Sequence, residues 1–246
     1  MNAARIIRTL VVPLTLGLLL STALYAQTNF PNLNFERARV PDLLPDSLGD
    51  VVTRSQALPG WLSMVGSNAD PPINHNFLFH GTAGISLFGP QSLMTAPEGN
   101  YFVALQAGQN PETPPGGLVD SSIAQFGTVP SFAQSIQFLA SQGMPNAAVS
   151  FGGQSLPFTL LYIEPSGWGR WAVDISPFAG QSGELRFTAL SMPGPSLAFF
   201  LDDIRFSPLP VPEPSSWAFL ALGAALIVIT RKFLARTSSS RQGEGL

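Results

Sequence analysis

The sequence predicts an all-β fold, an antiparallel sandwich of two sheets, between an N-terminal signal peptide and a C-terminal transmembrane helix. Short apolar runs recur between turn-forming residues, and the 246 residues include 23 Gly and 23 Pro, which favours many turns between short strands. Several of these runs alternate between apolar and polar residues with a period of two. The body of the chain has neither heptads nor a long helical period, so helices are not expected to build the core.

Each apolar or alternating run is expected to form one strand. The expected strands are residues 33–37, 60–64, 76–80, 84–88, 101–107, 121–126, 133–140, 147–151, 156–164, 169–174, 184–190 and 197–206. In the run 184–190, Leu185 and Phe187 share one face while Arg186 lies on the other. Two surface loops, 39–57 and 108–118, and one short helical turn, 174–178, connect these runs.

The N-terminus has the features of a secretory signal peptide, residues 1–26. Two arginines precede an apolar stretch from Leu10 to Leu20, whose 11 residues are too few to cross a bilayer. Small residues allow cleavage after Ala23 or after Ala26, and Ala26 is slightly favoured because it leaves a longer segment after the apolar stretch. An uncleaved N-terminal anchor is the alternative.

The C-terminal part of the chain predicts a single membrane-spanning helix. From Pro214 to Thr230 there are 17 residues without a charge, which make about 25 Å of helix against a hydrocarbon core of about 30 Å. The helix reaches residues 215–234 if the first basic side chains extend towards the head groups. A basic stop follows the helix and consists of Arg231, Lys232 and Arg236. The positive-inside rule then places the tail, 237–246, in the cytoplasm. A buried core helix is the alternative.

Pro212, Glu213 and Pro214 stand directly before this apolar helix and its basic cluster. This order, over residues 212–236, resembles the PEP-CTERM sorting signal of Gram-negative-type bacteria. The polar extension 237–246 departs from it, because such tails more often end soon after the basic cluster. The resemblance implies export, a transient anchor in the inner membrane, processing by an exosortase-type membrane protease, and a final place at the cell surface or outside the cell.

One domain, 27–206, and a proline-containing linker, 207–211, lie between the two signals. The residues from Gln27 to Pro210 include six Arg, no Lys and 13 acids, a formal net charge of −7. This stretch has no basic patch to neutralise phosphates, which argues against a nucleic-acid partner. The chain has no Cys, so the stability of the exported domain must come from its core or from a bound metal ion.

Four short segments occur in a recognisable order along residues 33–206. They are Leu33-Asn34-Phe35-Glu36, Leu58-Pro59-Gly60-Trp61, Trp171-Ala172-Val173-Asp174-Ile175-Ser176 and Phe199-Phe200-Leu201-Asp202-Asp203-Ile204. Their order is similar to that of the galactose-binding-like jelly roll shared by many carbohydrate-binding modules. The resemblance implies a jelly roll that binds extracellular polysaccharide. It also implies a structural calcium ion between an acid of the first strand, Glu36, and an acid of the last strand, Asp202.

The alternation of the last strand supports Asp202 as a metal ligand. If Phe200, Ile204 and Phe206 point into the core, Asp202 points with them and Asp203 points out. A buried carboxylate needs a counter-charge, which a hard cation such as calcium supplies. The alternative is that Asp202 pairs with an arginine or caps a turn.

Trp168 is the residue expected to stack on a sugar, with core packing as the alternative. It lies in the turn Ser166-Gly167-Trp168-Gly169, where a core tryptophan is less expected than in a strand. Trp61 and Trp171 are expected in the core. Trp168 and Trp171 are three positions apart and face opposite sides of a strand, so they cannot form one platform.

No catalytic site is predicted. His75 and His80 are the only histidines, and without Cys they do not make a zinc site of the usual spacing. The Gly-rich segment 151–155 lacks the G-x-S-x-G pattern of a serine nucleophile. Two carboxylates could meet in space as in a glycoside hydrolase, but no sequence feature selects a pair. The expected function is non-catalytic polysaccharide binding; a structural matrix protein without a sugar ligand and a hydrolase are the alternatives.

Overall fold

The computed structural model describes residues 30–44, 47, 49–78, 80–112, 116–143, 146–194 and 198–212. The predicted signal peptide, Glu213 and Pro214, the predicted membrane helix 215–234 with its basic stop, and the tail lie outside the described residues. Among the residues that are described, no helix has the length and apolar character needed to cross a membrane.

The fold is all-β, with two large sheets. The eight-stranded sheet has the order β1 (Asp50–Val52), β4 (Ile73–His75), β5 (Gly84–Phe88), β6 (Phe102–Gln106), β16 (Ala198–Ser207), β10 (Ser135–Ala140), β14 (Gly169–Asp174) and β13 (Phe158–Ile163). The six-stranded sheet has the order β12 (Gln154–Leu156), β11 (Ala147–Phe151), β15 (Ser182–Ala189), β9 (Ser121–Thr128), β2 (Leu62–Val65) and β3 (Asn68–Ala69). The remaining elements are a small hairpin of β7 (Gly108–Gln109) and β8 (Leu118–Val119), the helix α1 (Arg54–Ala57) and a 3₁₀ turn (Ser176–Phe178). The named strands pair antiparallel, as predicted, except β4 and β5, which are parallel.

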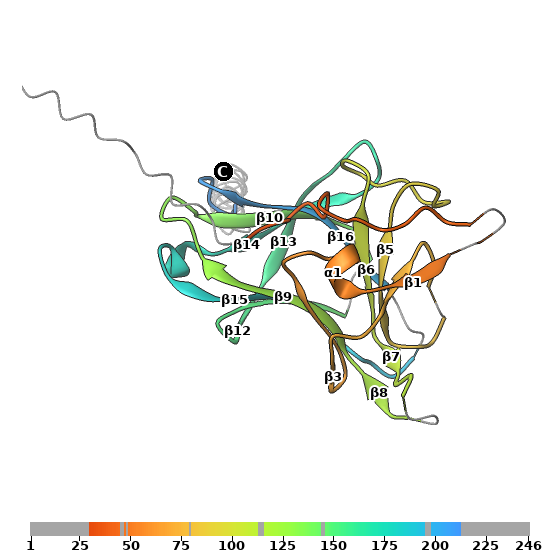
Figure 1. Cartoon of the computed structure of the whole chain (residues 1–246). Helices are drawn as coiled ribbons and strands as arrows, with labels where there is room; N and C mark the ends of the chain where they lie inside the picture. Colours follow the sequence, from red (N-terminus) through yellow and green to blue (C-terminus); the bar gives the residue numbers. More distant parts are fainter. Residues whose placement is uncertain are drawn as a thin grey trace, which may run out of the picture.

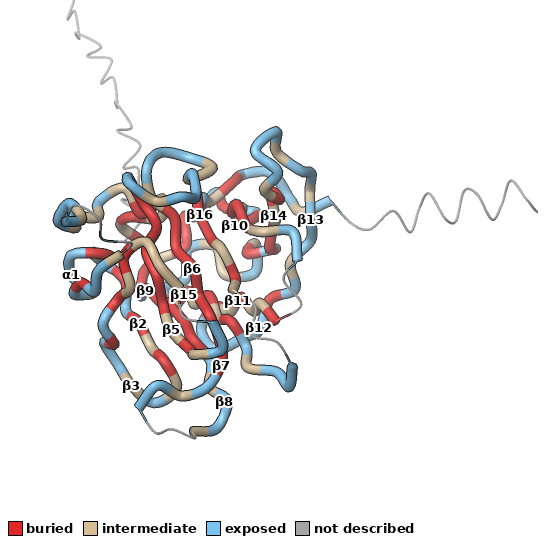
Figure 2. Tube along the Cα trace, turned by 90° about the vertical axis from the view of Figure 1, so that its right-hand side faces the viewer, coloured by how far each residue is buried: buried red, intermediate tan, exposed pale blue. Residues whose placement is uncertain are grey.

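The two large sheets pack face to face around one hydrophobic core. In Figure 1, β10, β14 and β16 form a layer above β9 and β15. Fully buried side chains from both sheets fill the space between them, including Leu105 of β6, Phe138 of β10 and Phe187 of β15. Each such side chain contributes about 1.5–3 kcal/mol through burial. Buried segments run along the central strands in Figure 2, while exposed segments gather at the connecting loops.

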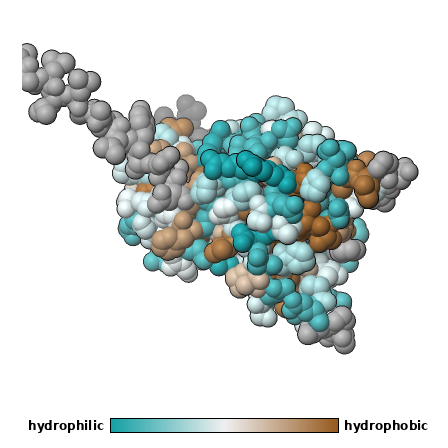
Figure 3. Space-filling view, in the orientation of Figure 1, coloured by the Kyte–Doolittle hydropathy of each residue, from teal (hydrophilic) through white to brown (hydrophobic). Residues whose placement is uncertain are grey.

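The predicted alternation in β15 is confirmed. Leu185, Phe187 and Ala189 are buried in the core, whereas Arg186 and Thr188 lie on the outer face. The outside of the domain is mixed in character, and Figure 3 shows the hydrophobic residues of one side as separate patches on a mainly polar surface.

Trp61 lies in the core, as predicted, and holds the N-terminal segment against it. Its ring is fully buried and lies 5.6 Å from the ring of Phe35 and 6.4 Å from that of Phe187. Its indole N–H donates to the backbone oxygen of Asn32 at 2.9 Å. The buried polar atom of the indole is therefore satisfied, as burial in a core demands.

Residues 33–37 form consecutive turns, so the strand predicted there is wrong. Asn32 and Phe35 have φ values of 59° and 61°, in the left-handed region that a strand does not use. The Asn32 side chain stabilises this path, because it donates to the Pro59 oxygen at 3.1 Å and accepts from the Arg37 N–H at 2.9 Å. Asparagine supports such turns through these local hydrogen bonds.

Other differences from the predicted strands have equally local causes. The run 156–164 is interrupted at Pro157, which cannot donate to a ladder. Leu156 ends β12 in one sheet, and the residues after Pro157 form β13 in the other. The strand predicted at 76–80 lies earlier, at β4, and Asn76 has a positive φ of 65°. The first predicted loop contains β1 and α1. The predicted strands 84–88, 147–151 and 169–174 are confirmed with the same bounds.

A β-bulge in β16 changes which of its side chains face the core. Gln137 and Leu139 of β10 pair with Arg205 and Asp202 of β16, so β16 takes three steps where β10 takes two. The extra residue is accommodated next to Asp203, whose φ is 40°.

This bulge overturns the alternation predicted for the last strand. Leu201 before the bulge and Ile204 after it both lie in the main core, whereas Phe200 packs in a second, smaller cluster. Phe200 and Ile204 therefore do not share a face. Asp202 is fully buried. Its carboxylate accepts a hydrogen bond from the loop 98–101, which shows that it lies under this loop rather than between the sheets.

Candidate functional site

Trp168 lies in the second hydrophobic cluster, on the outer side of the eight-stranded sheet. This cluster contains the buried residues Phe88, Phe102 and Ala104, with Phe200 and Trp168 packed against them. The half-buried Trp168 ring meets Phe102 edge-to-face at 5.3 Å and Phe200 at 6.2 Å. Trp171 instead packs with Phe158 against the main core at a ring distance of 5.5 Å, so the two tryptophans are separated as predicted.

The part of Trp168 that is not packed lines a shallow groove of about 280 Å³, which also includes Met94, Gln142 and Phe200. Hydrogen bonds hold the turn that carries Trp168, including one at 3.5 Å from the Trp168 N–H to the Ser166 hydroxyl. Glu164 N–H donates to the Trp168 oxygen at 2.7 Å, and Gly167 N–H donates to the Glu164 oxygen at 2.9 Å. The Gln142 side chain donates to the Gly167 oxygen at 2.6 Å. The ring is therefore presented by a fixed backbone.

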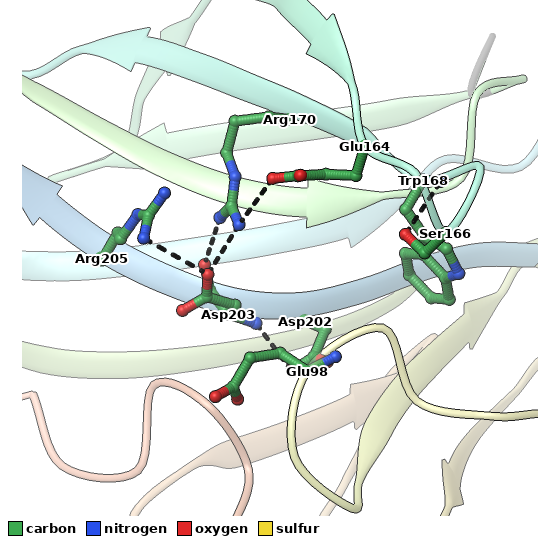
Figure 4. Close-up of polar contacts among 8 residues, drawn as sticks. All are labelled: Glu98, Glu164, Ser166, Trp168, Arg170, Asp202, Asp203 and Arg205. Carbon is green, nitrogen blue, oxygen red and sulfur yellow. Dashed lines mark hydrogen bonds and ion pairs between the residues drawn. The ribbon is translucent and has the colours of Figure 1, made fainter.

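A second, charged groove of about 460 Å³ adjoins the first. Ser166 lines both grooves, so the turn from Glu164 to Trp168 forms the ridge between them. The charged residues that line the second groove are Glu98, Glu164, Arg170, Asp203 and Arg205. Figure 4 shows both arginines pointing towards Asp203, with the Trp168 ring at the other end of the group.

Arg170 is the fixed centre of the charged groove. It is 3 % exposed, and its guanidinium lies 2.8 Å from the Asp203 carboxylate and 3.4 Å from that of Glu164. It also donates to the Asp203 backbone oxygen at 3.1 Å. Its Nε has no hydrogen-bond partner among the described residues.

Arg205 and Glu98 are the accessible groups of the charged groove. The Arg205 side chain is 49 % exposed, and its guanidinium lies 3.8 Å from the Asp203 carboxylate. This long, exposed ion pair contributes little to stability. Glu98 is exposed as well. Both side chains can therefore exchange water for the hydroxyl groups of a ligand.

Glu36 and Asp202 both bind backbone N–H groups of the loop 98–101. Glu36 accepts from the N–H groups of Asn100 and Tyr101, each at 2.8 Å, and from the Asn100 side chain at 3.0 Å. Asp202 accepts from Glu98 N–H at 3.3 Å and from Asp203 N–H at 2.7 Å. Gly99 makes this close approach possible, because a Cβ there would lie 2.5 Å from a Glu36 oxygen.

Burial raises the pKa of Asp202 to about 8. The two backbone N–H donors oppose this effect, and the nearby charges of Asp203 and Glu98 add to it. The described ion pairs of Arg170 and Arg205 involve other carboxylates. A buried carboxyl in this position needs either a proton or a cation.

The two acids fit a calcium ion unequally. Asp202 fits a hard cation because it is buried without a described cationic partner. Glu36 fits less well, because it is less buried and accepts three N–H donors, whereas Asp202 accepts two. Within the described part of the chain, no three His, Asp or Glu side chains come together as a metal site would require.

The two histidines lie apart from both grooves. His75 is buried in β4, and neither of its ring nitrogens has a hydrogen-bond partner among the described residues. Burial lowers the pKa of His75, and the charge of Asp50 acts in the opposite direction. His80 is exposed in a turn. Pro212, the first residue of the sorting motif, is exposed at the end of the described chain.

Phe126 is not among the predicted site residues, yet at 70 % exposed it is the most exposed aromatic residue in the described part of the chain. It lies on β9, where Ile123 faces the core. Phe126 has the opposite parity to Ile123 and so points outward. The period-two pattern of this strand was the signal that could have found it.

No family model, curated protein or solved structure matches this chain. Its function is inferred from its own residues and their geometry.

Proposed function

We propose that the protein is exported, held briefly in the inner membrane, processed by an exosortase-type protease and delivered to the cell surface or extracellular matrix. The N-terminal apolar stretch, the Pro212-Glu213-Pro214 motif and the basic stop support this route. The exposure of Pro212 also supports it, because a protease needs access to the segment that follows the last strand.

The body of the protein is proposed to be a galactose-binding-like jelly roll that binds polysaccharide without catalysis. The observation that carries this proposal is the pair of grooves on either side of the Glu164–Trp168 turn. An aromatic ring packs against the apolar face of a pyranose, and exposed carboxylates and guanidiniums bind its hydroxyls. Trp168 offers the first kind of contact; Glu98 and Arg205 offer the second.

Such a site should bind one sugar unit weakly. The ring of Trp168 is partly packed, and both grooves are open, so little ligand surface is removed from water. We expect a dissociation constant in the range of about 1 μM to 1 mM for one site. Repeated sugar units on one polymer would then raise the overall affinity.

Calcium is proposed as a structural cofactor at Asp202, with Glu36 holding the same loop. Support comes from the burial of Asp202 and the lack of a described cationic partner. The ion would supply the missing counter-charge and keep the loop 98–101 closed over the sheet. Glu98, which lines the charged groove, lies in this loop.

Affinity electrophoresis of the mature exported protein, in gels with the exopolysaccharide of the bacterium that produces it, tests the binding site. Trp168→Met keeps an apolar side chain against Phe102 but removes the flat ring, and we expect about tenfold weaker retention. Phe132→Met changes an exposed ring elsewhere, 53 % exposed, and should retain wild-type mobility. If the Trp168 variant is retained like wild type, Trp168 does not take part in polysaccharide binding. No retention of the wild type would favour a structural matrix protein, and shortened glycan products would favour a hydrolase.

A further inference from the structure

The outer face of the six-stranded sheet carries an exposed aromatic ring on a rigid support. Phe126 lies on β9 and pairs directly with Glu184 of β15. Leu62 of β2, 54 % exposed, is its diagonal neighbour across Ala124. Strand pairing fixes the backbone beneath these side chains, so the ring stands on a sheet and not on a loop.

A planar ion pair lies beside this ring. Arg186 and Glu184 are two residues apart on β15 and share its outer face. Their side chains meet through two contacts, at 2.8 and 3.0 Å. Arg186 also donates to the Ser122 hydroxyl at 2.7 Å and to the Met64 sulfur at 3.6 Å. These bonds fix the guanidinium and the carboxylate in place on the outer face of the sheet.

The other outward positions around the ring carry small side chains. Ser122 and Ala124 lie on β9, Thr188 lies on β15, and Ser150 of β11 pairs with Arg186. Ser122 and Ala124 are 5 % and 1 % exposed, because longer neighbouring side chains such as Arg186 cover them. The accessible groups on this face are the Phe126 ring, Leu62 and the partly exposed ion pair of Arg186 and Glu184, together here called the Phe126 platform.

The charges of the platform indicate the chemistry of its ligand. The donors of Arg186 are directed to Glu184, Ser122 and Met64, so the platform offers no spare cation to an anionic polymer. Glu184 keeps lone pairs for hydroxyl donors, and the platform as a whole is neutral. A second copy of the chain is less suitable, because each body carries a formal net charge of −7 and like charges repel. A neutral, hydroxyl-rich chain fits best.

The Phe126 platform and the Trp168 groove lie on opposite sides of the molecule. Trp168 packs on the outer side of the eight-stranded sheet, and Phe126 projects from the outer side of the six-stranded sheet. The main core separates the two sheets. One sugar unit therefore cannot contact both sites.

We infer that the Phe126 platform is a second, independent binding site for neutral polysaccharide, so that one molecule can cross-link two polymer chains. This inference rests on the proposed function, because it assigns a second site for the same kind of polymer. A protein monomer can cross-link two polymers only if one polymer segment cannot fill both of its binding sites. The placement of the two sites on opposite outer faces meets that requirement.

Bridging and retention, measured on the mature protein, test this inference. The probes are latex beads coated with the neutral fraction of the exopolysaccharide, and beads coated with its uronic-acid-containing fraction. Wild-type protein should aggregate the neutral beads at least about tenfold more than the anionic beads.

The variants separate the two sites. Phe126→Ala should abolish bead aggregation, but the Trp168 groove should still retain it in the gel. Trp168→Met should also lose aggregation, and the double variant should lose retention by both sites. Phe132→Ala is the matched exposed-ring control and should behave as wild type.

Each contrary result identifies which proposal fails. If Phe126→Ala still aggregates the beads, the Phe126 platform is not a sugar site, even where the Trp168 groove binds. If Trp168→Met changes nothing while Phe126→Ala removes all retention, the Trp168 groove fails and the cross-linking inference falls with it. Sedimentation that shows a wild-type dimer but a Phe126→Ala monomer would assign the platform to a second copy of the chain. No retention of wild-type protein on either fraction would overturn both proposals.

Discussion

Glu36 and Asp202 hold one loop from two distant parts of the chain. Glu36 lies in the N-terminal turns and accepts the N–H groups of Asn100 and Tyr101, while Asp202 lies in the last strand and accepts the N–H of Glu98. The loop 98–101 is therefore fastened at both ends by carboxylates. Its position, and that of the charged groove beside it, depends on these two acids.

Glu36→Gln should loosen this loop and lower the free energy of unfolding. The substitution removes a charged acceptor that binds three donors, and bonds to charged groups are worth about 1.5–3 kcal/mol each. We expect a total loss of about 1–3 kcal/mol, because water replaces part of the interaction. Urea unfolding measures it. Glu112→Gln removes an exposed carboxylate that binds the Asn68 side chain and should cost less than about 0.5 kcal/mol. Equal losses in the two variants would contradict the role of Glu36.

Without calcium, the protein should become less stable as pH rises from about 4 to about 8. Burial raises the pKa of Asp202 to about 8 from the ordinary 3.8, so in this window the folded state holds a proton that the unfolded chain has released. The favourable contribution is complete below the unfolded pKa and is lost as pH rises through the folded pKa. The slope should be on the order of 1 kcal/mol per pH unit.

Asp202→Asn is the comparison for this pH dependence, since it cannot ionise. Chemical unfolding at several pH values, with a chelator present, should show a flatter profile for this variant than for wild type. Parallel profiles would mean that Asp202 ionises in the folded protein as it does in the unfolded chain.

Calcium should raise the melting temperature of the wild-type protein, and more strongly at pH 9 than at pH 5.5. A ligand that binds only the folded state stabilises it by mass action, and calcium must displace the proton that Asp202 holds at lower pH. Differential scanning fluorimetry in millimolar calcium or in chelator measures the shift. Asp202→Ala should remove the shift, while Glu112→Gln should retain it. The same melting temperature with and without calcium at pH 9 would rule out the ion.

Substitution of Glu213 should separate export from processing. Wild-type protein recovered from the cell surface should begin near Leu24 or Gln27 and should lack the residues after the Pro212–Pro214 motif. Glu213→Ala should still be exported but should accumulate as an uncut, membrane-bound chain. Mass spectrometry of surface and membrane fractions distinguishes the two forms. Intact peptides from Arg231 to Leu246 on surface protein would contradict the sorting signal.

The all-β class and most central strands could be predicted because each depends on a local pattern. The alternation of Leu185, Phe187 and Ala189 is visible in the sequence and is sufficient to place β15. Trp61 was predicted in the core, and its ring is fully buried. These are positions at which local preference and tertiary packing agree.

The remaining features depend on contacts that the local pattern does not contain. The bulge near Asp203 adds one residue to β16. Because Phe199, Phe200 and Leu201 are all apolar, the sequence does not show which of them faces the core. Trp168 was expected to be exposed because glycines flank it, but Phe102 and Phe200 come from distant strands to support its ring. The meeting of Glu36 with the loop 98–101 is likewise a product of the fold, because these segments are far apart in the sequence.

The bulge in β16 also couples Asp202 to Asp203, so that a change at one shifts the other. The Asp203 N–H binds the Asp202 carboxylate, while the Asp203 oxygens bind Arg170. A proton or cation gained at Asp202 therefore acts on the backbone that positions Arg170 in the charged groove. Thermodynamic linkage makes any such effect mutual: if calcium strengthened sugar binding, the polymer would strengthen calcium binding by the same factor. Molecules embedded in polysaccharide would then keep their ion at calcium concentrations at which free molecules lose it.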